Sequence, residues 1–146
     1  MAITFEHAID LAQPPAAVFA VLDDFSQLPK WLKPCEGLAK LGPGPNAVGD
    51  KLRYAYVQGG RHGVMDGVIV AREENTQLTC KYYDRMFTVV VEFRVRMGRG
   101  GGTHLVHHIE ITPNSFMAKL MSPLIKGQLP KQTVQSMETL RGLLGA

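Results

Sequence analysis

The sequence predicts an α+β fold in which a curved antiparallel β-sheet wraps around one long C-terminal helix, with two short helices after the first strand. Two observations predict it. Several runs alternate apolar and polar residues, and short Gly-rich or polar turns join them. A last strand-like run, Thr103 to Ile111, is followed by an amphipathic stretch from Phe116 to Leu144. Because this helix must bury its apolar face, we expect it to cover the concave face of the sheet, with a pocket where the two do not fully collapse.

The composition is typical of one soluble globular domain. The chain has 146 residues, 45% hydrophobic and 20% charged, so we expect a single domain over residues 1–146. A net charge of +3 without a Lys/Arg run predicts no nucleic-acid partner. No apolar run is long enough to span a membrane and no signal peptide is visible, so we expect a cytoplasmic protein without integral membrane association. Cys35 and Cys80 are then expected as free thiols.

The N-terminal elements are a strand and two short helices. Apolar residues alternate with polar ones from Ile3 to Leu11, which predicts a strand. Pro14-Pro15 ends it, and because proline fits the first helical turn, residues 16–22 are predicted to form a short helix. Helical spacing of apolar residues from Phe25 to Leu32 predicts a second one, closed by Pro34.

The middle of the chain is predicted to form a sequential antiparallel sheet. Its connections are short, which favours pairing of neighbours in the sequence. The expected strands are Glu36 to Leu41, Leu52 to Val57, Val64 to Ala71, Leu78 to Tyr83, Phe87 to Met97 and Thr103 to Ile111.

The C-terminal helix contains Pro123 and Pro130. Each removes a backbone donor, so we predict a short first helix, an irregular joint between the prolines and a long final helix from about Lys131. The residues expected near one face are Phe116, Leu120, Leu124, Val134, Met137, Arg141 and Leu144.

Four local phrases carry a resemblance to a known superfamily. They are Ile9-Asp-Leu-Ala-Gln-Pro-Pro-Ala-Ala-Val-Phe19, Leu22-Asp-Asp-Phe-Ser-Gln-Leu-Pro-Lys-Trp31, Ala47-Val-Gly-Asp50 and Gly101-Gly-Thr103. Their order and spacing resemble the START-like, or SRPBCC, superfamily with its helix-grip fold, and within it the polyketide cyclase/dehydrase-like branch. The resemblance implies a hydrophobic cavity between sheet and helix. The superfamily includes ligand carriers, cyclases and hydrolase-like members, so the fold does not choose among these functions.

Strand alternation predicts which side chains line this cavity. On the strand from Phe87 to Met97 the apolar parity faces the helix, while Glu92, Arg94 and Arg96 face water. Among the inward residues, His7 and His107 are polar groups on an otherwise apolar face. The expected ligand-cavity residues are Phe5, Trp31, Tyr54, Tyr56, Phe87, Val89, Val91, Phe93, Leu105, His107, Phe116, Leu120, Leu124 and Met137.

Each polar or aromatic candidate has a functional and a structural interpretation. His7 and His107 either contact a ligand or act as acid/base groups, or they are histidines satisfied by backbone or water. An inward Tyr82 either orients a polar ligand group or packs with its hydroxyl at the rim. Trp31 either gates the cavity mouth or plugs the space between a short helix and the sheet.

No metal site is expected. His104, His107 and His108 invite one, but His107 points opposite to the other two. His104 and His108 lie about 13 Å apart along a strand, too far to chelate one ion.

The leading functional hypothesis is binding or transport of a hydrophobic or aromatic small molecule, such as a lipid or a polyketide. An alternative is a polyketide cyclase/aromatase-like enzyme with a sparse acid/base site made of His107, His7 and Tyr82. A second alternative is an interaction protein with a collapsed cavity. No cofactor is expected, and the sequence leaves both the ligand and the choice between monomer and homodimer open.

Overall fold

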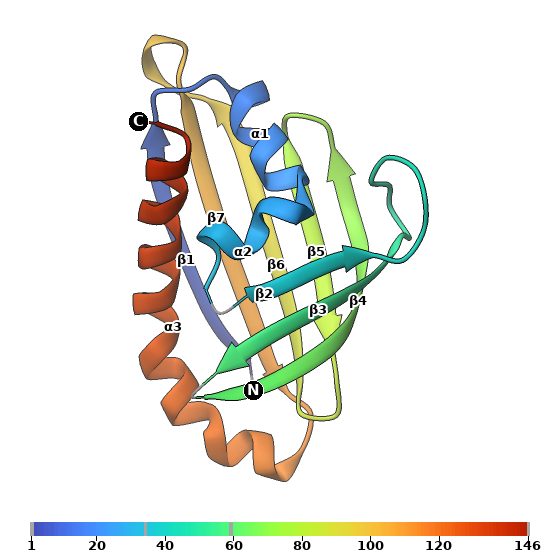
Figure 1. The fold of residues 1–146 in the computed structure, drawn as a ribbon. Helices are drawn as coiled ribbons and strands as arrows, with labels where there is room; N and C mark the ends of the chain where they lie inside the picture. Colours follow the sequence, from blue (N-terminus) through green and yellow to red (C-terminus); the bar gives the residue numbers. More distant parts are fainter. Residues whose placement is uncertain (1, 34, 59, 146) are drawn as a thin grey trace.

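The structure is a computed structural model that describes residues 2–33, 35–58 and 60–145, and in these residues seven strands form one antiparallel sheet. The strand order is β1-β7-β6-β5-β4-β3-β2, so only β1 leaves the sequential order and pairs with β7. Figure 1 shows that the sheet is curved and that the helices lie on one side of it. The strands are β1 (Ile3–Leu11), β2 (Cys35–Lys40), β3 (Lys51–Gln58), β4 (Arg61–Glu73), β5 (Gln77–Tyr83), β6 (Phe87–Met97) and β7 (Thr103–Pro113).

The concave face is covered by a long helix and by short ones. The long helix α3 (Phe116–Leu143) packs on β1 and β7 at one side of the sheet. Helix α1 (Pro15–Asp23) packs on β6, while the one-turn helices η1 (Phe25–Gln27) and α2 (Leu28–Trp31) pack on β2. A further turn, η2 (Arg99–Gly101), joins β6 to β7. The predicted helix-grip architecture is therefore confirmed, although the predicted end at Pro34 lies outside the described residues.

The expected break in the last helix is wrong. α3 runs without interruption from Phe116 to Leu143 and contains both Pro123 and Pro130. The carbonyl groups that Pro123 and Pro130 leave without a helical donor belong to Lys119 and Lys126, and both of these residues are exposed. The helix changes direction along its first half instead of ending (Figure 1). The Ser115 side chain accepts a hydrogen bond from the Ala118 backbone N–H at 3.1 Å and so caps its start.

The predicted alternation of β6 is clear from Phe93 to Arg96, whereas residues 87–92 are all half-buried. Phe93 and Val95 are buried on the concave side, whereas Arg94 and Arg96 are exposed. Glu92 faces outward but is only partly exposed, because Arg94 Nε lies 2.6 Å from its carboxylate. Met97 was expected inside and is 70% exposed, since the strand end extends beyond the helices that cover the sheet.

An ion pair fixes the short helices to the sheet. The guanidinium of Arg72 on β4 donates to both carboxylate oxygens of Asp23, at 3.1 and 2.8 Å. Asn46 donates to the same carboxylate at 3.0 Å, and Arg72 also lies over the Phe19 ring. Burial raises the pKa of Asp23, but the hydrogen bonds from Arg72 and Asn46 outweigh it and hold this pKa below its usual value. The C-terminal end of α1 is thereby held against β4.

Candidate functional site

His107 lies at the centre of the apolar layer between sheet and helices. It is fully buried on β7, opposite His7 on β1 and Phe93 on β6. Its ring stacks on the Phe93 ring, with centroids 4.4 Å apart. Within the described residues, neither ring nitrogen of His107 has a hydrogen-bond partner. The described residues therefore do not supply the backbone partner that one form of the structural interpretation expected.

The surroundings of His107 keep its imidazole neutral. Burial, and then the nearby His108 and His7, lower the pKa of His107 to about 3. At neutral pH the side chain therefore offers one N–H donor and one nitrogen acceptor, not a positive charge.

His7 is less enclosed than His107. It is half-buried on the same concave face, and its ring is parallel to that of Phe5 at a centroid distance of 6.5 Å. The cross-strand pairing places the two histidines side by side on β1 and β7. The predicted pair of polar groups is thus brought together at one side of the sheet, where α3 covers it.

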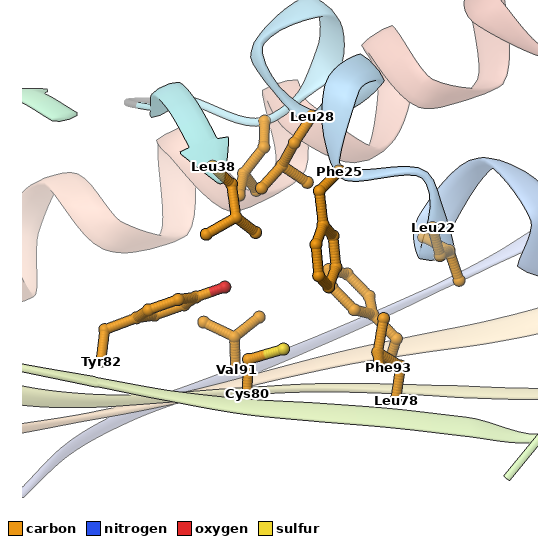
Figure 2. Close-up of a pocket in the computed structure, with 10 residues that line it drawn as sticks. Leu22, Phe25, Leu28, Leu38, Leu78, Cys80, Tyr82, Val91 and Phe93 are labelled. Atoms are coloured by element: carbon orange, nitrogen blue, oxygen red, sulfur yellow. The ribbon is translucent and has the colours of Figure 1, made fainter. Parts of the chain in front are cut away.

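The apolar layer over β5 and β6 leaves little free space. A small void lies over β5 and β6, and Figure 2 shows the side chains that line it. Its volume is about 10 Å³, which is enough for about one water molecule. Small-molecule sites commonly occupy about 300–1,000 Å³. The void is lined by Leu22, Phe25, Leu28, Leu32, Leu38, Leu78, Cys80, Tyr82, Val91 and Phe93.

Tyr82 reaches this void from a glycine-lined part of the sheet. It pairs across strands with Gly67, and a Cβ on Gly67 would lie only 2.6 Å from the Tyr82 ring. The ring therefore lies flat on β4, and its hydroxyl points into the space between Leu38 and Val91 (Figure 2). Burial first, and then Cys80, raise the pKa of Tyr82 well above its usual value, so the phenol stays protonated.

A row of stacked tyrosines extends from Tyr82 toward β3. The Tyr82 and Tyr54 rings are 4.7 Å apart, and the Tyr54 and Tyr56 rings are 5.9 Å apart. Tyr54 is buried and Tyr56 is half-buried. These predicted residues thus lie together as one aromatic surface.

The other predicted lining residues fall into three groups. Trp31, Leu105 and Met137 are fully buried, and Trp31 packs edge-on against Phe93 at 5.7 Å. The partly buried ones are Phe5, Phe87, Val89 and Val91. The placement of three more was wrong, because their side chains are on the surface: Phe116, Leu120 and Leu124 are 73%, 61% and 60% exposed.

Their exposure has a simple geometric reason. The inward side of the first half of α3 carries the buried residues Ala118 and Leu129. Residues four and eight positions apart share one helix face, so Phe116, Leu120 and Leu124 form a stripe that points away from the sheet.

Sequence reasoning also missed part of the lining. Leu22, Phe25, Leu28 and Leu38 come from the short helices and from β2 and close the void from above (Figure 2). The helical spacing of Phe25, Leu28 and Leu32 was the available signal. It predicted a short helix but not that its apolar side chains lie over β5 and β6.

The described ranges contain neither a metal-binding cluster nor a membrane-spanning helix. They contain no group of three His, Cys, Asp or Glu side chains that could hold a metal ion. None of the helices in these ranges combines the length and the apolar character needed to cross a bilayer. A wider surface hollow of about 760 Å³ lies at the end of β6 and β7, among Asp10, Arg96, Arg99 and His104.

Comparison with known proteins identifies the family. A family model described as "Polyketide cyclase / dehydrase and lipid transport" matches residues 2–140. No curated protein matches the sequence.

Solved structures share the fold at low identity. A START superfamily protein from Mycobacterium smegmatis is 16% identical with a TM-score of 0.80, covering 97% of each chain. The ZhuI aromatase/cyclase from Streptomyces sp. R1128 is 14% identical with a TM-score of 0.80, covering 99% of this chain and 94% of that one. This chain therefore belongs to the family described as polyketide cyclase/dehydrase and lipid transport.

Proposed function

We propose that this protein binds a hydrophobic or aromatic small molecule between the concave face of the sheet and the helices, with His107 and Tyr82 as its polar contacts. Family membership supports a ligand-binding or cyclase role in general. The observation that carries the proposal is the imidazole of His107, which is fully buried without a hydrogen-bond partner among the described residues.

An unpaired buried imidazole is unfavourable for folding alone. A buried polar group without a partner costs about 1–3 kcal/mol, and a leucine at this position would avoid that cost. A ligand hydroxyl or carbonyl would supply the missing hydrogen bond to His107. The Phe93 ring is in contact with His107 and also borders the void, so a ligand that displaces this ring would reach the imidazole.

Ligand entry requires the cover of the void to move, because about 10 Å³ holds no organic molecule. The cover consists of small elements. Phe25 belongs to a three-residue helix, Leu28 to a four-residue helix, and Leu38 to the edge strand β2. Elements with few hydrogen bonds of their own open at a lower free energy than the central strands. We therefore place the entrance on this side, over β5 and β6.

His107 is better suited to binding a ligand than to acid/base catalysis. An efficient general base has a pKa near the working pH, whereas burial lowers the pKa of His107 to about 3. A neutral imidazole is suited to orient a polar ligand group by hydrogen bonding.

A pair of matched ligands tests the proposal. Displacement of the fluorescent probe 1-anilinonaphthalene-8-sulfonate is measured with 1-naphthol and with naphthalene, which differ by one hydroxyl group. The wild type should bind 1-naphthol more tightly, and His107→Leu should reduce that binding about tenfold while leaving naphthalene unchanged. His108→Leu, the neighbour on the outer face, serves as control. An equal loss for both ligands, or no loss at all, would contradict the role of His107.

A second candidate is an interaction domain whose apolar layer is permanently filled. The observation that favours it is the same small volume of the void. If neither compound displaces the probe from the wild type, and naphthalene does not raise the melting temperature, the interaction domain is supported and the ligand-binding proposal fails.

A further inference from the structure

The first half of α3 exposes an unusual amount of apolar surface. Phe116, Met117, Leu120 and Leu124 have exposed fractions of 73%, 61%, 61% and 60%. The spacing of Phe116, Leu120 and Leu124 places them on one helix face, with Met117 beside it. Figure 1 shows that these first turns extend past the ends of the strands. They therefore form a projecting apolar surface, which we call the α3 apolar face.

The second half of the same helix behaves differently. There the exposed positions include the polar residues Lys131, Gln135 and Glu138, while Met137 and Leu140 are fully buried. This is the ordinary amphipathic pattern of a helix on a domain surface. The first half places large apolar groups where the second half has polar ones, so folding of the single chain does not explain the α3 apolar face.

Lysines lie along the part of α3 that carries the α3 apolar face. The sequence from Asn114 to Met137 contains Lys119, Lys126 and Lys131 and no acidic residue. All three lysines are exposed, and none of them forms an ion pair in the part of the chain that the structure describes.

Two neighbouring segments carry further charged residues. The β5–β6 turn, which carries half-buried Asp84 and exposed Arg85, is joined to the start of α3 by the Asn114 N–H bond to the Met86 carbonyl at 2.7 Å. The β3–β4 hairpin carries exposed Arg61. It is joined to α3 through the Gln58 amide, which donates to the Gln128 side chain at 2.6 Å.

We propose that the α3 apolar face docks on an anionic lipid surface, with Phe116, Met117, Leu120 and Leu124 inserted between the head groups. The lysines would then face lipid phosphates. A helix with large apolar groups and lysines beside them, and without the length of apolar sequence needed to span a bilayer, has the character of an interfacial helix. A second copy of this chain is a poorer occupant, because a two-fold contact through this face would bring the lysines of both copies together.

Vesicle co-sedimentation of the whole chain tests the proposal. We expect binding to phosphatidylglycerol vesicles, weak binding to phosphatidylcholine vesicles, and loss of binding as the salt concentration rises. Replacing Lys119, Lys126 and Lys131 by Gln should weaken binding at least tenfold, since one lysine near an anionic surface contributes about fivefold. Leu120→Glu with Leu124→Glu should abolish binding. Met97 is 70% exposed and lies at the end of β6 opposite to the β5–β6 turn. The Met97→Glu variant should therefore bind like the wild type.

A tryptophan reporter tests which surface touches the lipid. The natural Trp31 is fully buried, so its emission contributes a constant background. Phe116→Trp should show a blue shift on phosphatidylglycerol vesicles, and Met97→Trp should not. The proposal is overturned if the wild type does not bind these vesicles, or binds both lipids equally at all salt concentrations. It is also overturned if native mass spectrometry shows a dimer that Leu120→Glu dissociates while vesicle binding is absent.

Discussion

The imidazole of His107 packs nearly parallel on the phenyl ring of Phe93, with an interplanar angle of 25° and centroids 4.4 Å apart. The same phenyl ring packs edge-on against Trp31 and borders the small void over β5 and β6. One aromatic side chain therefore separates an unpaired polar group from the space that a ligand would have to enlarge.

Replacing the buried imidazole by an apolar side chain should stabilise the fold. We expect His107→Leu to raise the free energy of unfolding by about 1 kcal/mol, because it removes an unpaired buried polar group and fills a similar volume. Urea denaturation measures the change, with His108→Leu on the partly exposed outer face as the matched control, expected within about 0.5 kcal/mol of the wild type. A clear loss of stability in His107→Leu would mean that the imidazole already has a partner.

Acid should destabilise the protein through His107. Its pKa is lowered from 6.5 to about 3 on folding, so between these values the unfolded chain binds the extra proton. As far as His107 is concerned, the free energy of unfolding is therefore highest above about pH 6.5. It decreases as the pH falls, by up to about 1.4 kcal/mol per pH unit. Urea denaturation between pH 4 and 7 should show this slope in the wild type and in His108→Leu. A His107→Leu variant with an unchanged slope would assign the acid sensitivity to other groups.

A methyl group on Gly67 should displace Tyr82. The added Cβ would lie 2.6 Å from the Tyr82 ring and 3.1 Å from the Lys81 carbonyl, so we expect Gly67→Ala to destabilise the fold by about 1–3 kcal/mol. Gly37→Ala is the control, because a Cβ at this strand glycine meets nothing within 4 Å. Thermal unfolding measures both. Equal melting temperatures for the two variants would show that the tyrosine has room to move.

Loss of the Asp23 carboxylate should loosen the short helices. Asp23→Ala leaves Arg72 without its two charge-assisted hydrogen bonds, and both side chains are only 21% exposed. We expect a loss of about 1–3 kcal/mol in the free energy of unfolding. We also expect hydrogen exchange in this variant to become faster, relative to the wild type, in α1 and α2 more than in the central strands.

Asp66→Ala is the control for this change, because Asp66 is an exposed carboxylate on the same strand as Arg72. A variant at Asp23 that behaves like the one at Asp66 would show that Arg72 does not hold these helices.

Strand alternation was sufficient to place much of the candidate site. The parity of β6 and β7 correctly predicted that Phe93, Val95, Leu105 and His107 face the helices. Local alternation is reliable here because a shift by one residue would expose a whole apolar set of side chains.

The sequence by itself determined the strands, the short helices, the late long helix and the polar pair on the concave face, because these follow from local periodicity and turn chemistry. Only the tertiary structure decided that α3 continues through two prolines and that its Phe116 stripe points away from the sheet. It also decided that the short helices fill the space over β5 and β6 so far that a void of only about 10 Å³ remains. These outcomes depend on the length and position of each element relative to the elements packed against it. Periodicity predicts which residues share one face of an element, but not whether that face contacts another element or solvent.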